Sequence, residues 1–494
     1  MKDLLFRFAA LIIVSVSVLS ACNEHTIEPV FFGTIEGTVT FESSGAPAAG
    51  VEVATTPVTS TVITDEQGHF SLTDVPTGEY TVVARLEGYT NASDRLSVTK
   101  GNTTTATLQL TPDSSTPNSP EVVFPAAGAE NIDRSVTLQW SVIEKNNEEL
   151  TYDVVLYESN QPTPLVDLEG RPDTVLQVEH LKFNTSYYWQ VTVRNSAGVA
   201  TRGELWQFRT RAFPDNRFLF ASTRNGNYEL YSTDETGQDL VQLTYSDREQ
   251  VYPRYSNDRN LIAYAEYSDL AYHIFYMNRD GSAPVKVTTL PIAGNHCDGR
   301  SFCWSPDNGK FLYSHYDKLY SIDRNGSNLA LIATAPPGRN FRGCDWTAVG
   351  NKVVAETVGT LPYDGEIHLI DPVSGTDDVI IPNEAGTLQS PSFSIDGTYV
   401  LFTDDVSDFQ AADGRQLDAH LFLYNIATGA RTDLSTLKES GTNDLNPRYS
   451  PDGASIIFEN RRNDGSGTSS IYTYEIATKT RRLLFENAQM PDWQ

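Results

Sequence analysis

Hydrophobic and polar residues alternate over short stretches along most of the chain, from about residue 32 onward. These stretches are rich in Thr, Val, Tyr and Phe, and Gly, Asn, Asp and Pro separate them. Alternation with a period of two is typical of strands with one buried face, and the separating residues favour tight turns. The sequence therefore predicts an all-β protein. Its 494 residues exceed what one hydrophobic core usually organises, so we expect several domains.

The N-terminal residues follow a different pattern. A mainly apolar run extends over 12 residues from Phe8 to Leu19, which is too short to span a bilayer and is typical of a signal peptide. The run ends in Leu-Ser-Ala-Cys, which resembles the bacterial lipobox. This resemblance implies a signal peptide at 1–21, a lipid on Cys22 and a tether at 22–31. The alternative is an ordinary signal peptide that is cleaved elsewhere.

The lipobox resemblance also predicts a location. Since no later segment has 18 consecutive apolar residues, the mature chain would contact the membrane only through its lipid anchor. Asn23 follows the cysteine in place of Asp, and by the rule for this class of protein that favours the outer membrane. We expect a protein of the cell envelope, and the choice between the periplasmic and the surface side stays open.

Residues 32–111 carry the alternation and turn spacing of a small β-sandwich. Glycines and aromatic residues recur in "GTIEGTVTF" and in "TDEQGHFSLTDVPTGEYTV", and "EGY" follows. This stretch resembles the carboxypeptidase regulatory-like domain, which has a transthyretin-type fold. Such domains serve as spacers, so the resemblance implies no chemistry here.

A second sandwich is expected at 121–212, after a Pro- and Ser-rich linker at 112–120. Trp140 closes the apolar stretch "VTLQW", and a series L-x-x-x-T-x-Y-x-W-x-V runs from Leu181 to Val193. This series resembles a fibronectin type III domain. The resemblance implies that Trp140 lies in the core and that Tyr187 is the corner tyrosine.

Residues 213–494 contain a repeat, and the repeat predicts a propeller. In five copies an aromatic residue, here named the anchor, stands nine residues before the end of the next strand. A sixth anchor, Trp493, stands near the chain end, and the spacings are 49, 42, 47, 56 and 44. The five copies are Tyr255 with Tyr264, Trp304 with Tyr313, Trp346 with Ala355, Phe393 with Phe402, and Tyr449 with Phe458.

The sixth repeat is divided between the two ends of this region. The strand that should follow Trp493 is supplied by residues 217–222, "RFLFAS". We therefore expect a six-bladed propeller closed by pairing of its N- and C-terminal strands, which leaves no open edge. The repeats "YSPDG" and "WSPDNG" resemble the TolB-type propeller of the WD40-like Pro-Asp family. "TAVGN" after Trp346 departs from that pattern, which puts the turn there in doubt.

The formal net charge is −28. Attachment to nucleic acid depends on neutralising phosphates with Lys and Arg, so a nucleic-acid partner is disfavoured. The TolB resemblance implies envelope partners, for example peptidoglycan-associated lipoproteins. We expect the propeller to bind an envelope protein or a glycan without catalysis, and the sequence leaves the oligomeric state open.

The rival hypothesis is a polysaccharide-degrading enzyme, a lyase or a glycoside hydrolase. Ser305, Asp307 and Gly309 match part of the Asp-box turn of sialidase-like propellers, but no carboxylate pair stands out among 64 acidic residues. A metal lyase would need converging histidines, whereas the propeller's histidines occupy different repeat positions. We therefore expect no catalytic residue, cofactor or metal, although a metal in the channel stays an open alternative. The five histidines are His273, His296, His315, His368 and His420.

Three cysteines remain in the propeller: Cys297, Cys303 and Cys344. Cysteines of exported proteins usually form disulfides, so we expect one bridge that includes Cys303, with its partner left open, and one free thiol. Zinc binding is the alternative, and it would include His296.

Four arginines are candidates for ligand binding. Arg254 and Arg448 directly precede an anchor, while Arg300 and Arg342 stand four residues before one. We expect all four to cluster at one mouth of the channel and to bind an anionic ligand. The alternative is that they form ion pairs between blades, for instance with Asp345 and Asp492.

Overall fold

The computed structural model describes residues 30–112, 116–143, 149–383, 386–412 and 414–494. The described chain is built of β-strands and contains one short 3₁₀ helix, Val349–Asn351. The prediction of an all-β protein is therefore confirmed. None of the described helices is long and apolar enough to cross a bilayer. The predicted signal peptide, Cys22 and most of the tether lie outside the described residues, as do 113–115 of the linker.

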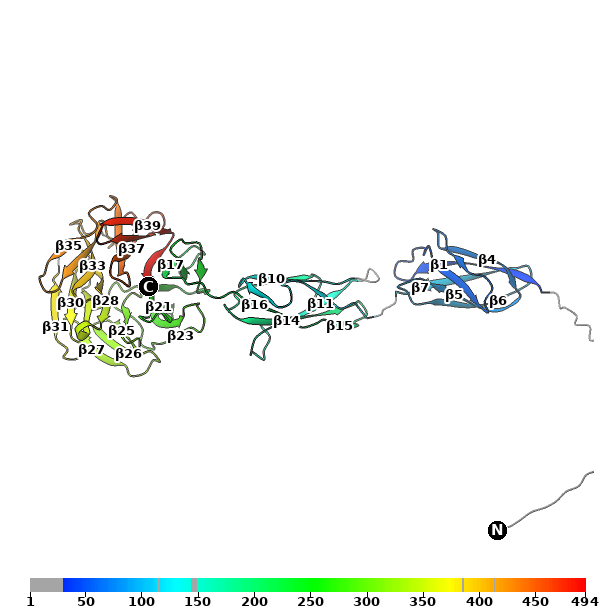
Figure 1. Ribbon diagram of the computed structural model, residues 1–494, viewed down its shortest axis with the longest axis horizontal. Coiled ribbons are helices and arrows are strands. Elements are labelled where there is room, and N and C mark those ends of the chain that lie inside the picture. The colour runs from blue at the N-terminus through cyan, green and yellow to red at the C-terminus, as the bar shows by residue number, and fades with distance from the viewer. Residues whose placement is uncertain (1–29, 113–115, 144–148, 384–385, 413) are drawn as a thin grey trace, which may run out of the picture. The chain divides into compact units, whose positions relative to one another are not determined.

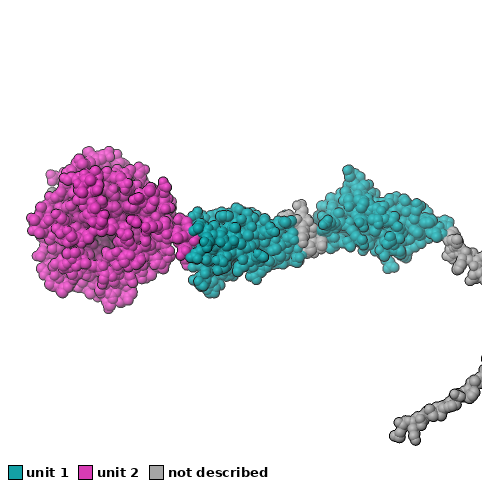
Figure 2. Space-filling view, viewed as in Figure 1, with its two compact units in different colours: residues 1–179, 185–209 teal, residues 180–184, 210–494 magenta. Residues whose placement is uncertain are grey.

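The chain divides into two compact units (Figure 2). The first comprises residues 1–179 and 185–209, and the second comprises 180–184 and 210–494. Each unit is described by itself below.

The first seven strands form a two-sheet sandwich (Figure 1). One sheet has the order β4-β1-β7, with β1 and β7 parallel, and the other has the order β3-β2-β5-β6. Gly37 of β1 is required by close packing, because a Cβ there would lie 2.2 Å from the carbonyl oxygen of Ala106. The strands are β1 (Phe32–Phe41), β2 (Glu52–Thr56), β3 (Val62–Ile63), β4 (His69–Pro76), β5 (Gly78–Arg85), β6 (Ala92–Val98) and β7 (Thr103–Leu110).

The next nine strands form a second sandwich. Its sheets have the orders β13-β10-β8 and β12-β11-β14-β16-β9, and β15 pairs with β14. Trp140, Tyr187 and Trp189 are buried in its core, at 2% exposure or less. The strands are β8 (Glu121–Phe124), β9 (Ala129–Ile132), β10 (Val136–Ser141), β11 (Thr151–Glu158), β12 (Val166–Arg171), β13 (Val175–Val178), β14 (Ser186–Arg194), β15 (Ala200–Arg202) and β16 (Trp206–Thr210).

The second unit is a β-propeller, and its described residues form six four-stranded antiparallel sheets (Figure 1). Five sheets use consecutive strands, each sheet starting with a strand that carries an anchor. The first of these sheets contains β20 (Gln250–Tyr255), β21 (Leu261–Ser268), β22 (Ala271–Asn278) and β23 (Val285–Lys286), and the second contains β24 (Phe302–Trp304), β25 (Lys310–His315), β26 (Lys318–Asp323) and β27 (Ala330–Thr334). The third contains β28 (Asn340–Thr347), β29 (Lys352–Val358), β30 (Gly365–Ile370) and β31 (Asp377–Ile381), and the fourth contains β32 (Gln389–Phe393), β33 (Tyr399–Asp405), β34 (Ala419–Asn425) and β35 (Arg431–Asp433). The fifth contains β36 (Thr442–Tyr449), β37 (Ser455–Arg462), β38 (Ser470–Glu475) and β39 (Thr480–Glu486).

The remaining sheet combines strands from both ends of the second unit. Its order is β19-β18-β17-β40, and β17 pairs with β40 so that Phe218 faces Trp493. The "TAVGN" segment, where the turn was in doubt, holds the 3₁₀ helix, and the strands on both sides of it form normally. The strands of this sheet are β17 (Phe218–Ser222), β18 (Glu229–Thr233), β19 (Val241–Gln242) and β40 (Gln489–Trp493).

The six strands that carry an anchor are called anchor strands below: β20, β24, β28, β32, β36 and β40. Four of them contain a residue with positive φ three positions before the anchor, followed by proline. The pairing register shifts at each of these places, as in a β-bulge. Left-handed backbone is costly for residues other than glycine, so the fold must hold these positions in place. They are Tyr252 (φ 52°), Ser390 (φ 56°), Asn446 (φ 50°) and Met490 (φ 52°).

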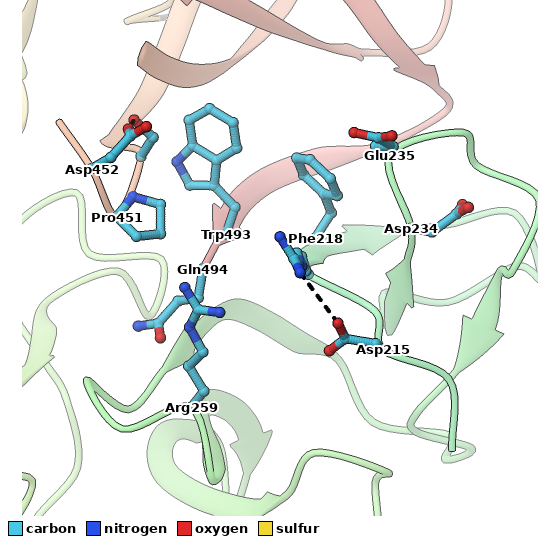
Figure 3. A pocket seen from close by; sticks show the side chains of 11 residues that line it. Asp215, Phe218, Asp234, Glu235, Arg259, Pro451, Asp452, Trp493 and Gln494 are labelled. Atoms are coloured by element: carbon cyan, nitrogen blue, oxygen red, sulfur yellow. Dashed lines mark hydrogen bonds and ion pairs between the residues drawn. The ribbon is translucent and has the colours of Figure 1, made fainter. Parts of the chain in front are cut away.

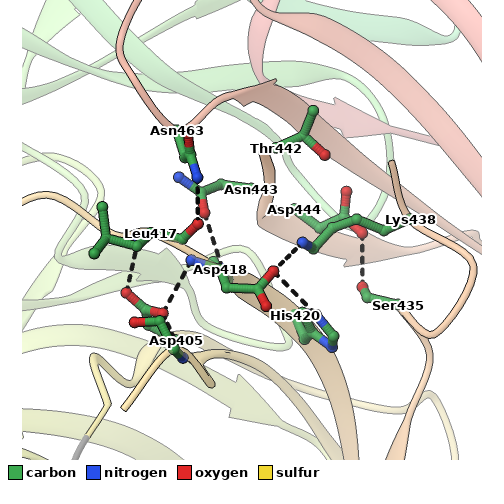
Figure 4. Close-up of polar contacts among 12 residues, drawn as sticks. Asp405, Leu417, Asp418, His420, Ser435, Lys438, Thr442, Asn443, Asp444 and Asn463 are labelled. Carbon is green, nitrogen blue, oxygen red and sulfur yellow. Dashed lines mark hydrogen bonds and ion pairs between the residues drawn. The ribbon is translucent and has the colours of Figure 1, made fainter. Parts of the chain in front are cut away.

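The longest repeat, from Phe393 to Tyr449, places extra residues in the loop between β33 and β34. Carboxylates organise this loop (Figure 4). Asp405 accepts hydrogen bonds from the backbone amides of Leu417 (2.8 Å) and Asp418 (3.0 Å). Asp418 in turn binds the ammonium group of Lys438, and its Oδ1 lies 3.3 Å from Nε2 of His420. These polar contacts explain how the insertion is accommodated without breaking the sheet.

Candidate functional site

One pocket of about 350 Å³ is lined by all six anchors. The residue directly before each anchor also lines this pocket, so that each anchor strand contributes two neighbouring residues. Two of these six residues are cationic, two are anionic and two are uncharged, so their formal charges cancel. In chain order they are Arg254, Cys303, Asp345, Ser392, Arg448 and Asp492. We call this cavity the anchor pocket.

Contacts between anchor strands run from sheet to sheet around the anchor pocket. Each neighbouring pair of sheets is joined by at least one contact between side chains or between a side chain and the backbone. The contacts are Tyr255 N to Asp492 Oδ2 (2.7 Å), Trp304 Nε1 to Arg254 O (3.2 Å), Cys344 Sγ to Cys303 Sγ (3.7 Å), Phe393 N to Asp345 Oδ2 (2.8 Å), Ser390 Oγ to Asn446 Oδ1 (3.3 Å) and Trp493 Nε1 to Tyr449 O (2.7 Å).

Of the two arginines of the anchor pocket, Arg254 is buried and Arg448 is half-buried, and neither is neutralised by a direct ion pair within the described chain. Arg254 is 8% exposed, and its Nη1 donates to the carbonyl oxygens of Pro253 (2.9 Å) and Pro491 (3.3 Å). Across the described chain, no carboxylate lies within 4.0 Å of the guanidinium of Arg254 or Arg448. Burial, and next the positive charge of Arg448, lower the pKa of Arg254. A buried cation of this kind is stabilised by an anion that enters the pocket.

The two aspartates of the pocket are held as hydrogen-bond acceptors. Asp492 accepts a hydrogen bond from the backbone amide of Tyr255, and Asp345 accepts one from the backbone amide of Phe393. Burial raises the pKa of both carboxyl groups, while the two arginines oppose that shift. The aspartates therefore connect neighbouring sheets through the backbone, and neither of them lies within 4.0 Å of the guanidinium of Arg254 or Arg448.

A larger cavity of about 640 Å³ continues from the anchor pocket, and the two share the lining residues Arg259, Ser450, Pro451, Trp493 and Gln494. Figure 3 shows Trp493 between Pro451 and Phe218, with Arg259 below them in this view. Asp234 and Glu235 line the same cavity, and Arg217 contacts Asp215 at 3.4 Å. A partner at the anchor pocket would therefore meet an extended surface with aromatic residues and both signs of charge.

The structure corrects the expectation that four arginines gather at one mouth. Arg254 and Arg448 line the anchor pocket, whereas Arg300 lines a separate cavity of about 220 Å³. Arg342 lines neither, because it is 1% exposed and is paired with the fully buried Glu356. The physical reason is distance along the chain: four residues of extended backbone cover about 13 Å, so a side chain four residues before an anchor lies well away from the pocket that the anchor lines.

None of the three described cysteines, Cys297, Cys303 and Cys344, is part of a disulfide in the structure. Cys303 and Cys344 lie in contact in the core between their two sheets, and Cys297 packs in another hydrophobic cluster. Burial, together with the neighbouring Cys344, raises the pKa of the Cys303 thiol well above its usual range. A thiol of this kind is a poor nucleophile at neutral pH. A bridge that includes Cys303 stays a prediction, and Cys344 is the partner that the geometry offers.

The Asp-box-like turn has a structural role in this chain. Ser305 Oγ donates to Asp307 Oδ1 (2.6 Å), and that carboxylate also accepts the amide of Gly309 (3.0 Å). The same serine–aspartate bond, at 2.6 Å, recurs in three other repeats, so it belongs to the turn between two strands. These other pairs are Ser256 with Asp258, Ser394 with Asp396, and Ser450 with Asp452.

Each of the five propeller histidines lies within hydrogen-bond distance of a backbone carbonyl or a carboxylate. Three of them contact backbone carbonyls of Thr288, Thr360 and Pro291, and the other two contact Asp377 and Asp433. Within the described residues, no group of three or more His, Cys, Asp or Glu side chains is arranged to hold a metal ion.

Sequence reasoning missed the tyrosine-lined cavity that contains Arg300. Tyr228, Tyr252 and Tyr272 line it. One signal was available, because a proline stands two residues before the anchor in four repeats: "YPRY", "SPSF", "NPRY" and "MPDW". Tyr252, Asn446 and Met490, which precede three of these prolines, all line the cavity. The proline motif therefore indicated that these strands are irregular. It did not indicate that the residues before the prolines line a cavity.

Comparison with known proteins supports one part of the sequence analysis directly. Residues 34–111 match the family model of the carboxypeptidase regulatory-like domain, so that assignment is confirmed. No curated protein sequence matches the chain significantly.

Solved structures with a similar fold include TolB from Acinetobacter baumannii, which is 14% identical with a TM-score of 0.43 over 62% of this chain and 79% of that one. A putative TolB from Agrobacterium tumefaciens is 14% identical with a TM-score of 0.40, over 55% and 90% of the two chains. Oligogalacturonate lyase from Vibrio parahaemolyticus is 15% identical with a TM-score of 0.36, over 55% and 72%.

Proposed function

We propose that this chain is a lipid-anchored binding protein of the bacterial cell envelope and that it is not an enzyme. In this proposal the propeller binds an envelope protein or a glycan. The carboxypeptidase regulatory-like domain and a fibronectin type III domain act as spacers between the propeller and the membrane.

The observation that carries the proposal is the pair of arginines at the anchor pocket, of which Arg254 is buried and Arg448 is half-buried. Arg254 and Arg448 have no carboxylate within 4.0 Å among the described residues, and they share a cavity of about 350 Å³. An anionic group of the partner would replace the water that burial has removed, in a setting where charge-assisted hydrogen bonds are strong. The buried thiols and the amide-bound aspartates of the same pocket offer no nucleophile paired with a base.

The proposal includes a closed ring of six blades. It is supported by the pairing of β17 with β40 and by the contacts that link each anchor strand to the next. A closed ring keeps the six residues before the anchors at fixed positions around one mouth, so that a partner meets a preformed surface.

Binding is tested with the mature full chain on envelope fragments, with peptidoglycan-associated lipoproteins and acidic glycans as the first candidates. Arg448→Gln should weaken capture of the true partner at least tenfold and reduce its salt dependence. The control is Arg482→Gln, which changes an exposed arginine of β39. If both variants capture the partner as well as the native chain does, the anchor pocket is not the binding site.

The absence of catalysis is tested separately. The mature protein is incubated with a panel of polysaccharides, with and without divalent metals, and the products are analysed for reducing ends and unsaturated uronates. The proposal predicts neither product. Release of either one by the native chain would establish the lyase or glycosidase alternative.

Lipid attachment is tested by metabolic labelling with an alkyne fatty acid. The native chain should be labelled, and Cys22→Ser should not. A native chain that carries no label would show that the N-terminal segment is an ordinary signal peptide.

A further inference from the structure

The anchor pocket contains charges of both signs that are not joined in ion pairs. Of the charged residues that line it, Arg448 and Asp345 are half-buried, Arg254 and Asp492 are each 8% exposed, and Arg259 stands exposed at the rim. The two buried residues contribute one charge of each sign. A ligand inside the pocket therefore meets one accessible cation, Arg448, and one accessible anion, Asp345.

Arg448 has hydrogen-bond donors that the protein leaves free. Its Nη1 donates to the carbonyl oxygen of Pro447 (3.3 Å), whereas Nε and Nη2 have no acceptor within the described chain. These two nitrogens are not buried. Together they form the edge of the guanidinium that binds both oxygens of a carboxylate, as the same two atoms of Arg300 do with Asp298.

Asp345 is the corresponding acceptor on another anchor strand. Its Oδ2 accepts a hydrogen bond from the Phe393 amide (2.8 Å), and no cation lies within 4.0 Å of its carboxylate in the described chain. Burial raises the pKa of this carboxyl group, and Arg448 is the charged residue that opposes this rise most. The two groups thus interact electrostatically across the pocket without forming an ion pair. A cation beside Asp345 would favour its charged form.

The fold keeps these two charged groups apart. Asp345 belongs to β28 and Arg448 to β36, and β32 contacts both of these strands. Ser392 occupies the corresponding position of β32, directly before its anchor. Asp345 and Arg448 therefore stand at fixed places on the pocket wall. A rigid site with separated charges is matched best by a ligand that carries the opposite charges in a similar arrangement.

Aromatic rings form much of the remaining wall. The anchors Trp346, Tyr449 and Trp493 are partly exposed. The faces of such rings attract a cation and pack against the CH groups of a ligand. The pocket volume of about 350 Å³ lies at the lower end of the range for small-molecule sites, about 300–1,000 Å³. The pocket is therefore suited to one small charged group of a larger partner.

From these observations we propose that the group of the partner that enters the anchor pocket is a free α-amino acid group, which has its ammonium and its carboxylate on one carbon atom. The carboxylate binds Arg448, with Arg254 behind it, and the ammonium binds Asp345 beside the Trp346 ring. This inference rests on the proposed function, because it names the chemical group that is recognised at the same site. A simple anion fits less well, since Asp345 would repel it.

The test compares two isomers that differ only in where their charges lie. Nε-acetyl-lysine has a free α-amino acid group, as a diamino acid has when it is attached to a polymer through its side-chain amine. Nα-acetyl-lysine has its ammonium at the far end of the side chain, and diacetyl-lysine has the carboxylate alone. The mature full chain is titrated with each by calorimetry and by tryptophan fluorescence, because Trp304, Trp346 and Trp493 line the pocket. Nε-acetyl-lysine should bind saturably and about tenfold more tightly than the other two.

Two variants assign the two charges. Asp345→Asn retains an acceptor for the Phe393 amide, and it should weaken binding of Nε-acetyl-lysine about tenfold without weakening that of diacetyl-lysine. Arg448→Gln should weaken binding of both compounds about tenfold, because both contain the carboxylate. The exposed control Arg482→Gln should change neither. The melting temperature of each variant is compared with that of the native chain.

The proposal is overturned if Nε-acetyl-lysine does not bind saturably, if either of the other two compounds binds as tightly, or if Asp345→Asn behaves like the control. The proposed function stands or falls separately. If diacetyl-lysine binds as tightly and Arg448→Gln weakens that binding, the pocket recognises a simple anion and the proposed function is retained. If no lysine derivative binds but Arg448→Gln still weakens capture of the envelope partner, only the assignment of the amino acid group is wrong. If neither is observed, both proposals are wrong.

Discussion

Phe218 lies directly opposite Trp493 in the antiparallel pair of β17 and β40, with ring centroids 5.6 Å apart, although the two residues stand at opposite ends of the propeller sequence. The Trp493 indole also donates to the carbonyl oxygen of Tyr449 in the neighbouring sheet, at 2.7 Å. One side chain therefore joins the first segment of the propeller, its last strand and the adjacent sheet.

Trp493→Ala should lower the free energy of unfolding of the propeller by roughly 2–4 kcal/mol, because it removes a partly buried aromatic residue and one hydrogen bond. Urea unfolding of the mature chain, followed by far-UV circular dichroism, measures this change. Val373→Ala is the control, since Val373 is 83% exposed. A Trp493 variant as stable as this control would show that the terminal strand does not hold the propeller together.

The buried pair of Arg342 and Glu356 should be costly to break from one side only. Arg342→Met leaves a carboxylate with 0% exposure without its cation, and we expect a loss of about 3–5 kcal/mol of unfolding free energy. The double variant Arg342→Met, Glu356→Leu should be less destabilised than Arg342→Met alone, because no buried charge remains. Urea unfolding of the native chain, Arg342→Met and the double variant measures these differences in unfolding free energy. Equal stability of the single and double variants would contradict this account.

The serine–aspartate turns should make stability depend on pH on the acidic side. The Ser305 hydroxyl, followed by the Gly309 amide, lowers the pKa of Asp307 below its usual value. Because the pKa is lower in the folded chain, the carboxylate stabilises the fold above about pH 4, and this contribution is lost as the pH falls through the folded pKa. Asp307→Ala should thus cost about 1 kcal/mol at pH 7 and less near pH 3. Urea midpoints at both pH values test this.

The matched control for that experiment is Asp378→Ala, at an exposed position of β31. It should leave the midpoints nearly unchanged at both pH values. A loss in Asp307→Ala that is the same at pH 7 and pH 3 would mean that the ionised carboxylate is not what stabilises the turn.

Mild oxidation should join Cys303 to Cys344 and leave Cys297 free. The two sulfur atoms lie 3.7 Å apart, and Cys297 packs in a different cluster. Peptide mass spectrometry after blocking of free thiols identifies the pair, for protein isolated from the envelope and for protein oxidised after purification. A bridge that includes Cys297 would contradict the arrangement of these two sheets.

Cys297 should react slowly with alkylating reagents at neutral pH. Burial raises the pKa of its thiol to about 11. Because the thiolate is the reactive form, the rate with iodoacetamide should rise about tenfold per pH unit from pH 8 to pH 10, without the plateau that an ordinary thiol reaches near pH 9. The rate is followed by mass spectrometry of the folded chain. A plateau below pH 10 would exclude the raised pKa.

Much of the fold could be predicted from local pattern. Alternation and turn residues identified the strands, and the nine-residue register of the anchors identified the repeat, because both depend on neighbours in the sequence. The carboxypeptidase regulatory-like domain was recognisable from glycines such as Gly37, whose lack of a side chain is required by packing against Ala106. The position of Trp493 in the repeat also predicted the strand with which it pairs.

The candidate sites were decided by the tertiary structure. The sequence determined that an arginine stands one or four residues before an anchor, but the mouth that each faces depends on how strands from different sheets come together. The same holds for the lack of an ion pair at Arg254 and Arg448 within the described chain, the Arg300 Nη1 without an acceptor and the contact of Cys303 with Cys344. How deeply a side chain is buried, and whether it has a hydrogen-bond or ion-pair partner, depend on residues that are distant in the sequence. No local sequence pattern therefore encodes these properties.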